Sequence, residues 1–131
     1  MTTKNFFLYQ TLLHLGFGIG LLLVPQMMLD TYGSQKTDIT GTFEIVARGY
    51  GTALIGLGIA AYMMRNAKAS LARYAFLVAT CVTGVLVTII HIRAILRGDE
   101  NSLGWVTVLL LVIVIAWSGM LLSKEKTDVL E

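Results

Sequence analysis

The chain has 131 residues, of which 56% are hydrophobic and only 14% are charged, whereas soluble domains carry about 25% charged residues. So much apolar surface excludes an ordinary soluble domain and predicts that lipid is the solvent. The net charge of +2 is small and scattered, which argues against a nucleic-acid partner. Cys81 is the single cysteine, which excludes an intramolecular disulfide, a CxxC redox pair and a thiolate zinc cluster.

Four apolar blocks are long enough to cross a membrane, for which about 20 helical residues suffice. In chain order they cover residues 6–29, 43–64, 71–96 and 103–122, each boundary being approximate. The first block is too long for a signal peptide and no A-x-A site follows it, so we expect a retained helix. The last block contains the unbroken run LLLVIVIA, which excludes the alternation typical of a membrane barrel strand. The sequence therefore predicts an all-α integral membrane protein.

The links between the blocks are polar and carry turn residues. The first link spans residues 30–42, the second residues 65–70, and the third, RGDENS, residues 97–102. Short links place consecutive helices antiparallel and side by side. We therefore predict that residues 1–131 form a single domain, a four-helix bundle with up-down-up-down topology. Leu130 and Glu131 are typical of a cloning scar and carry no functional argument.

Lysine and arginine residues predict the orientation, because loops rich in them stay in the cytoplasm. With an even number of spans, both termini share one side with the second link. That side carries Lys4, Arg65, Lys68, Arg73, Lys124 and Lys126. The opposite side carries Lys36 and Arg97 in links, with Arg48 and Arg93 inside helix ends. This distribution predicts that both termini are cytoplasmic.

Small residues recur at helical spacing in the first two spans, which lets a neighbouring backbone approach closely. They are Gly16 and Gly20 in the first span, and Gly49, Ala53, Gly56 and Ala60 in the second. We expect these residues to mediate helix packing. They either hold the bundle together or drive self-association, and the pattern leaves both open.

Ionisable residues at membrane depth are the candidates for function, because burying a charge in lipid is costly. Arg48 and His91 lie about equally far from the predicted outer ends of their spans. Glu44 shares a helix face with Arg48 at a spacing of four residues, and Arg93 lies near the same level. Together, Glu44, Arg48, His91 and Arg93 predict an outer polar cluster that binds a ligand. Alternatively, Glu44 only neutralises Arg48, Arg93 snorkels to the interface and His91 bonds a carbonyl.

Several cofactor and enzyme classes are disfavoured. His14 lies much deeper than His91, so these histidines are not placed to ligate one haem. The chain has no HExxH or similar metal motif and no serine in a nucleophile motif. We therefore expect no cofactor and no metal, and an enzyme is the least favoured reading.

The order of features along the chain resembles a known group of proteins. Gly16 to Leu23 is followed by Pro25, then by Tyr32 and Gly33, and then by ARGYGTALIGLGIA at residues 47–60. A third span that begins near Arg73 and a final span with tryptophan complete the pattern. It resembles the small four-span bacterial proteins described as DoxX-like or as domains of unknown function. The resemblance implies a bacterial inner-membrane protein without an established activity, and it supplies no catalytic residues.

The sequence favours a non-enzymatic accessory or scaffold protein, because the small-residue pattern is its clearest signal. Its expected partners are the lipid bilayer and either another membrane protein or a second copy of the chain. The alternative is a binder or transporter of a small anionic or amphipathic ligand, which would use the outer polar cluster.

Overall fold

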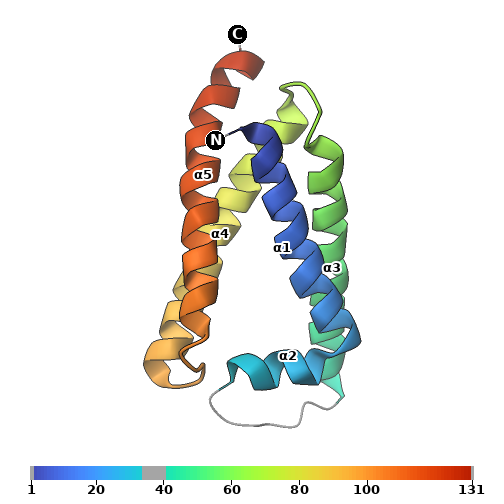
Figure 1. Ribbon diagram of the computed structural model, residues 1–131, viewed down its shortest axis with the longest axis vertical. Helices are drawn as coiled ribbons and strands as arrows, with labels where there is room; N and C mark the ends of the chain where they lie inside the picture. Colours follow the sequence, from blue (N-terminus) through green and yellow to red (C-terminus); the bar gives the residue numbers. More distant parts are fainter. Residues whose placement is uncertain (1, 34–40, 131) are drawn as a thin grey trace. The chain divides into compact units, whose positions relative to one another are not determined.

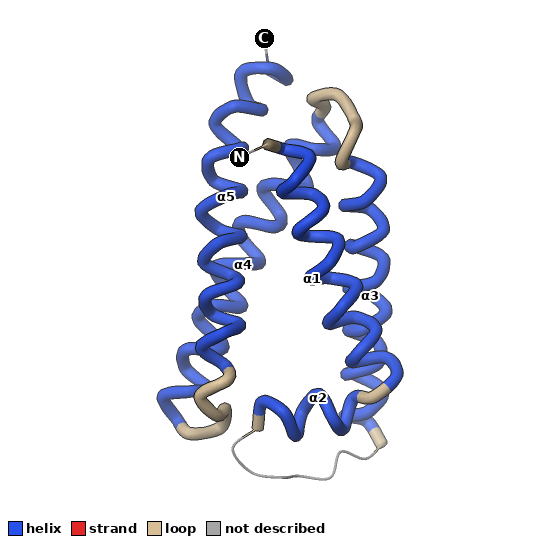
Figure 2. Tube along the Cα trace, viewed as in Figure 1, coloured by secondary structure: helices blue, strands red, loops and turns tan. Residues whose placement is uncertain are grey.

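The computed structural model describes the backbone of residues 2–33 and 41–130 and the side chains of these residues up to residue 125. Five α-helices and no strand occur in that part of the chain (Figures 1 and 2). They are α1 (Thr3–Leu23), α2 (Pro25–Tyr32), α3 (Thr42–Met64), α4 (Leu71–Arg97) and α5 (Gly104–Leu130). The all-α prediction is confirmed. Lys36 and Glu131 lie outside the described residues.

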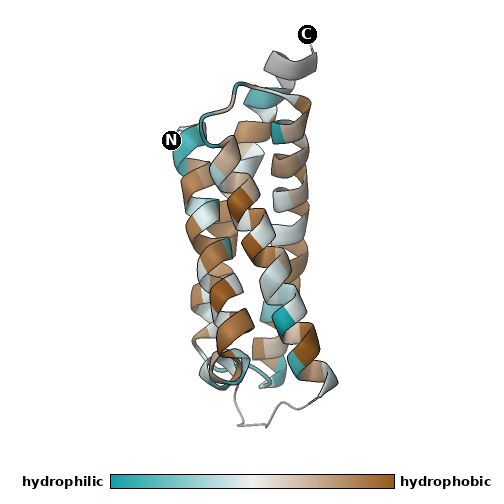
Figure 3. Cartoon of the chain, turned by 90° about the vertical axis from the view of Figure 1, so that its right-hand side faces the viewer, coloured by the Kyte–Doolittle hydropathy of each residue, from teal (hydrophilic) through white to brown (hydrophobic). Residues whose placement is uncertain are grey.

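Helices α1, α3, α4 and residues 104–125 of α5 are each long and apolar enough to cross a membrane. Hydrophobic residues recur along the whole length of these helices (Figure 3). Large apolar side chains stand exposed on every one of them, among them Leu12, Phe43, Leu96 and Leu109. Exposed apolar side chains on this scale fit helices whose outer faces contact lipid. The chain is therefore a multi-pass membrane protein.

The first predicted span, residues 6–29, is wrong at its C-terminal end, since α1 stops at Leu23 and a separate helix begins at Pro25. Proline has no N–H to donate to the carbonyl four residues back, and it disfavours helical geometry in the preceding residue. Val24 accordingly leaves the helical region, with φ −134° and ψ 55°. The chain turns there, so that α2 lies across the end of α1 (Figure 1).

The contacts of the chain fall into two compact units. The N-terminal unit comprises residues 2–65 and pairs α1 with an antiparallel α3; the C-terminal unit comprises the residues from Asn66 onward and pairs α4 with an antiparallel α5. The prediction of one four-helix domain with up-down-up-down topology stays a prediction.

Helices α1 and α3 approach each other through glycines. A Cβ placed on Gly51 would lie 2.7 Å from the carbonyl oxygen of Gly18, and one placed on Gly18 would lie 2.8 Å from the carbonyl oxygen of Gly51. A Cβ on Gly58 would touch the side chain of Leu15 at 3.0 Å. The two backbones are therefore so close that a methyl group at Gly18 or Gly51 does not fit.

The predicted packing residues lie elsewhere on these helices. In the described part of the chain, a Cβ on Gly16, Gly49 or Gly56 would have no heavy atom within 4 Å beyond the neighbouring backbone of its own helix. Residues are about 100° apart around a helix, which puts Gly49, Ala53 and Gly56 on the side of α3 opposite Gly51. Ala53 is exposed and Ala60 is half-buried. Gly20 does pack closely, against the sulfur of Met28 in α2. A packing role for the open face of α3 stays a prediction.

The α4 and α5 helices pack through residues three or four apart. On α5 the buried set includes Thr107, Val114, Ser118, Leu121 and Glu125, and on α4 it is Arg73, Leu77 and Gly84. This heptad-like spacing keeps one stripe of each helix facing the other. Gly98 ends α4 in the left-handed conformation with φ 78°, which glycine adopts without strain. The following N–H, of Asp99, bonds back to Ala94 and starts the predicted third link.

Candidate functional site

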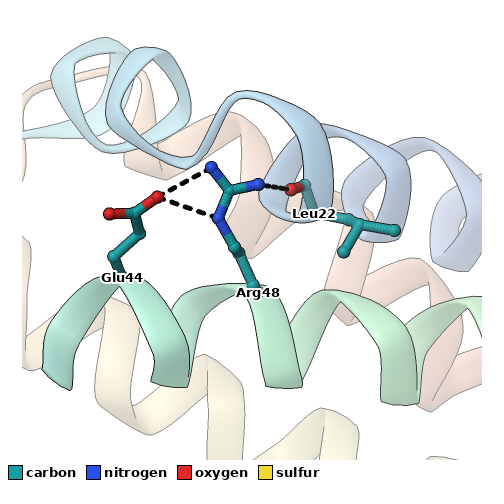
Figure 4. Close-up of polar contacts among 3 residues, drawn as sticks. All are labelled: Leu22, Glu44 and Arg48. Atoms are coloured by element: carbon teal, nitrogen blue, oxygen red, sulfur yellow. Dashed lines mark hydrogen bonds and ion pairs between the residues drawn. The ribbon is translucent and has the colours of Figure 1, made fainter. Parts of the chain in front are cut away.

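The predicted Glu44 and Arg48 side chains form an ion pair one turn apart on α3. Arg48 Nε donates to Glu44 Oε1 at 2.9 Å, and Arg48 Nη2 donates to the same oxygen at 2.7 Å. Arg48 Nη1 donates to the backbone carbonyl of Leu22 in α1 (Figure 4). The two side chains are 41% and 42% exposed. Arg48 thus joins α3 to the end of α1, while part of its side chain stays exposed.

The bond to Leu22 follows from the break at Pro25. The last carbonyls of a helix have no intrahelical donor and need another partner. Val24 N–H bonds to Gly20, but Pro25 has no N–H for Leu21, and the helix does not continue past Leu23. Arg48 supplies the missing donor for Leu22, and its positive charge is favourable at the negative end of the α1 dipole. The Glu44–Arg48 pair therefore stabilises the end of α1 before Pro25.

An open cavity of about 620 Å³ adjoins this pair, within the range of about 300–1,000 Å³ that small-molecule sites occupy. The described residues that line it come from the end of α1, from α2 and from the start of α3. The apolar lining is Leu23, Val24, Pro25 and Met27, and the polar lining is Gln26, Asp30, Thr31, Glu44 and Arg48. Gln26 Nε2 donates to Asp30 Oδ1 at 2.9 Å, which holds this carboxylate in place. We call this space the α2 cavity.

His91 and Arg93, the other two residues of the predicted cluster, belong to the C-terminal unit. His91 Nδ1 donates to Glu100 Oε2 at 2.8 Å, and both side chains are about four-fifths buried, with 21% and 19% exposed. Glu100 lies in the link that folds back after α4 and packs against Gly104. Arg93 is exposed on α4. Among the predicted cluster residues, Glu44 and Arg48 contact each other, while the partner of His91 is an acid outside the predicted set.

A buried ion pair between Arg73 and Glu125 was missed by the sequence reasoning. Arg73 Nη2 donates to Glu125 Oε1, and Arg73 Nη1 donates to the carbonyl of Ala67 in the link before α4. The two side chains are only 9% and 5% exposed. The available signal was the spacing on α5, since Glu125 continues the buried stripe of Ser118 and Leu121. The pair ties the first turn of α4 to the far end of α5.

The remaining histidine and the described acids form no cluster of metal ligands. His14 Nδ1 bonds to the carbonyl of Gln10 in its own helix at 2.8 Å. Within the part of the chain that the structure describes, no three His, Cys, Asp or Glu side chains are grouped to hold a metal ion. Comparison of the chain with models of known families, with curated proteins and with solved structures finds no match.

Proposed function

We propose that the protein is a non-enzymatic membrane protein that acts as an accessory or scaffold partner and binds a neighbouring transmembrane helix along α3. The observation that carries this proposal is the open face formed by Gly49, Ala53 and Gly56. Among the described residues, no heavy atom beyond the neighbouring backbone of α3 lies within 4 Å of a Cβ built on Gly49 or Gly56. The opposite side of α3 already contacts α1 through Gly51 and Gly58.

The physical reason lies in the lipid environment. Lipid tails are as apolar as leucine, so transmembrane helices associate through close packing, and small residues permit the closest approach. The contact between Gly18 and Gly51 demonstrates this kind of approach inside the N-terminal unit. A second small face on the same helix suits a second helix, from another membrane protein or from another copy of the chain.

The proposal is tested by comparing substitutions on the open face of α3 with a substitution at an exposed position off that face. Gly56→Leu and Ala53→Leu should remove a membrane-protein partner or a second copy from the protein purified in mild detergent, because the branched side chain separates the backbones. Ile59→Leu is the matched control, since Ile59 is exposed and lies off this face. Mass analysis of the purified complex is the measurement. An unchanged mass for both variants, or a lower melting temperature without a change in mass, would show that no outside helix binds there.

We also propose that the protein lies in a bacterial cytoplasmic membrane with both termini inside. The excess of basic residues near the termini and the second link supports this orientation, and the resemblance to the DoxX-like proteins supports the location. Reporter fusions at Lys68 and after Glu125 should report the cytoplasm, and a fusion at Asp99 should report the other side. A fusion at Lys68 that reports the outside would reverse the orientation.

The α2 cavity favours a second candidate function, binding of a small anionic or amphipathic ligand. The supporting observation is that charged and apolar side chains line one open space. A ligand that binds only the folded protein stabilises it by about 2.7 kcal/mol at a hundredfold excess over Kd. The melting temperature of the purified protein should therefore rise with a suitable lipid or small anion, and Arg48→Gln should reduce the rise. If no lipid or anion raises it, this function is excluded.

A further inference from the structure

We propose that the α2 cavity binds an amphiphile whose headgroup carries a primary ammonium, namely a zwitterionic phospholipid with an amine and a phosphate, in preference to a purely anionic ligand. The inference rests on the second candidate function, ligand binding in this cavity, and specifies the chemistry of the ligand. Three observations support it: the charges that line the cavity, the carboxylate oxygens and arginine N–H groups that remain available for hydrogen bonds there, and the position of the apolar lining.

The charges of the described lining do not balance. Among the residues that the structure describes, two carboxylates, Asp30 and Glu44, and one guanidinium, Arg48, line the cavity, which leaves one negative charge in excess. Glu44 already neutralises Arg48 through two hydrogen bonds. A purely anionic ligand would meet this net negative charge, whereas a ligand with an ammonium group would balance it. We therefore expect the cavity to prefer a ligand that also carries a positive charge over a purely anionic ligand.

The carboxylates of the cavity offer acceptors for the N–H groups of a ligand. Among the described residues, Glu44 Oε1 accepts both bonds from Arg48, and Asp30 Oδ1 accepts the bond from Gln26. The second oxygen of each carboxylate accepts no hydrogen bond from these residues. A primary ammonium has several N–H donors and can donate to both oxygens, while a trimethylated ammonium has none. The cavity should therefore distinguish a primary amine from a choline group.

The Arg48 guanidinium suits a phosphate. Each terminal nitrogen of a guanidinium carries two N–H groups. In Arg48 one N–H of Nη1 goes to Leu22 and one of Nη2 goes to Glu44, which leaves a further donor on each nitrogen. With the side chain 41% exposed, these donors can reach a phosphate oxygen, a preferred partner of arginine. One headgroup with both charges would thus satisfy Arg48 and the carboxylates together.

The apolar side of the cavity suits the tail of a lipid. Leu23, Val24 and Met27 line the cavity and are 65%, 41% and 60% exposed. They lie at the end of a membrane span, where α2 turns across α1, so the polar part of the cavity is at headgroup depth while its apolar edge adjoins lipid tails. A phospholipid can bind here without leaving the bilayer. This favours a lipid over a free, water-soluble amine.

The test measures lipid-dependent stabilisation of the full chain in detergent. Phosphatidylethanolamine should raise the melting temperature more than phosphatidylcholine, and phosphatidylglycerol should raise it least. Asp30→Asn should weaken the apparent affinity for phosphatidylethanolamine about tenfold, as expected for one charge-assisted hydrogen bond. Asp99→Asn is the matched control, because Asp99 is an exposed acid in the α4–α5 link, outside the cavity. Melting without lipid checks that both variants fold.

Three outcomes would overturn the inference, each in a different way. Equal or stronger stabilisation by phosphatidylglycerol would show that an anion is the ligand, so that the binding function survives but the ammonium preference is wrong. If soluble phosphoethanolamine stabilised the protein as much as phosphatidylethanolamine does, the ligand would be a free, water-soluble amine and not a lipid. Stabilisation by none of these probes would exclude the binding function itself.

Discussion

The Glu44–Arg48 pair of the N-terminal unit and the Arg73–Glu125 pair of the C-terminal unit join the same kinds of group in opposite surroundings. The first pair is 41% and 42% exposed beside an open cavity, and the second is 9% and 5% exposed between two helices. Exposed pairs contribute little to stability, whereas removing one partner of a buried pair leaves a charge without compensation. The Glu44–Arg48 ion pair is therefore accessible to a ligand, whereas the Arg73–Glu125 ion pair holds α4 against α5.

The largest effect is expected from breaking the buried pair. Glu125→Ala should lower the free energy of unfolding by about 3–5 kcal/mol, because Arg73 would stay buried without its carboxylate. Lys124→Ala is the control, since Lys124 is the exposed neighbour. Melting temperatures in detergent measure both. Because apolar replacement of both partners is often neutral, the double variant Arg73→Met with Glu125→Leu should regain most of the loss. If Glu125→Ala and Lys124→Ala melted at the same temperature, the buried pair would contribute no more to stability than an exposed pair does.

The glycine contact of the N-terminal unit should give the next largest effect. Gly51→Ala places a Cβ 2.7 Å from the Gly18 carbonyl oxygen, and such overpacking costs about 1–3 kcal/mol. Gly49→Ala is matched in chemistry, but its new Cβ would meet no described heavy atom within 4 Å apart from the nearby backbone of α3. It should leave the melting temperature unchanged or slightly raised. Similar destabilisation by both would contradict the assignment of the α1 contact to Gly51.

A smaller effect is expected at the exposed pair, and it should be asymmetric. Glu44→Gln should cost about 0.2–1 kcal/mol, as for other exposed ion pairs. Arg48→Gln should cost more, about 1–3 kcal/mol, if the Leu22 carbonyl is left without a donor. Chemical unfolding followed by circular dichroism would compare them. If the two variants lose equal stability, the bond to the end of α1 contributes nothing and the pair is only a surface ion pair.

The smallest effect is expected from Arg93→Gln. Arg93 is exposed on α4, and surface substitutions usually stay within about 0.5 kcal/mol. Neither the melting temperature nor its response to lipid should change. A lost lipid response in this variant would restore the predicted cluster in which Arg93 acts together with Glu44 and Arg48.

The spans could be predicted from the sequence because lipid leaves the backbone few alternatives to a helix. The same rule made the break difficult to place. Proline is tolerated inside many membrane helices, so Pro25 alone did not show that α1 ends at Leu23. The contact of Arg48 with Leu22 depends on that break and was therefore out of reach, although its spacing from Glu44 was enough to predict the ion pair.

Long-range contacts were harder to predict for a different reason. Helix α3 carries small residues on two opposite sides, and its own sequence does not reveal which side meets α1. The structure puts Gly51 and Gly58 there, whereas the sequence pattern had favoured Gly49 and Gly56. Likewise, Arg73 and Glu125 are 52 positions apart, and pairing them requires the register of the whole α4–α5 hairpin.

The break at Val24 also sets the thickness of membrane that the N-terminal unit suits. At about 1.5 Å per residue, the 21 residues of α1 span about 31 Å, close to a hydrocarbon core of about 30 Å. The 27 residues of α4 span about 40 Å and must tilt or extend into the headgroups. If α1 continued through Pro25, it would exceed the bilayer in the same way. By turning the chain at Val24, the protein limits hydrophobic mismatch at α1, so a thicker bilayer should strain this helix before it strains α4.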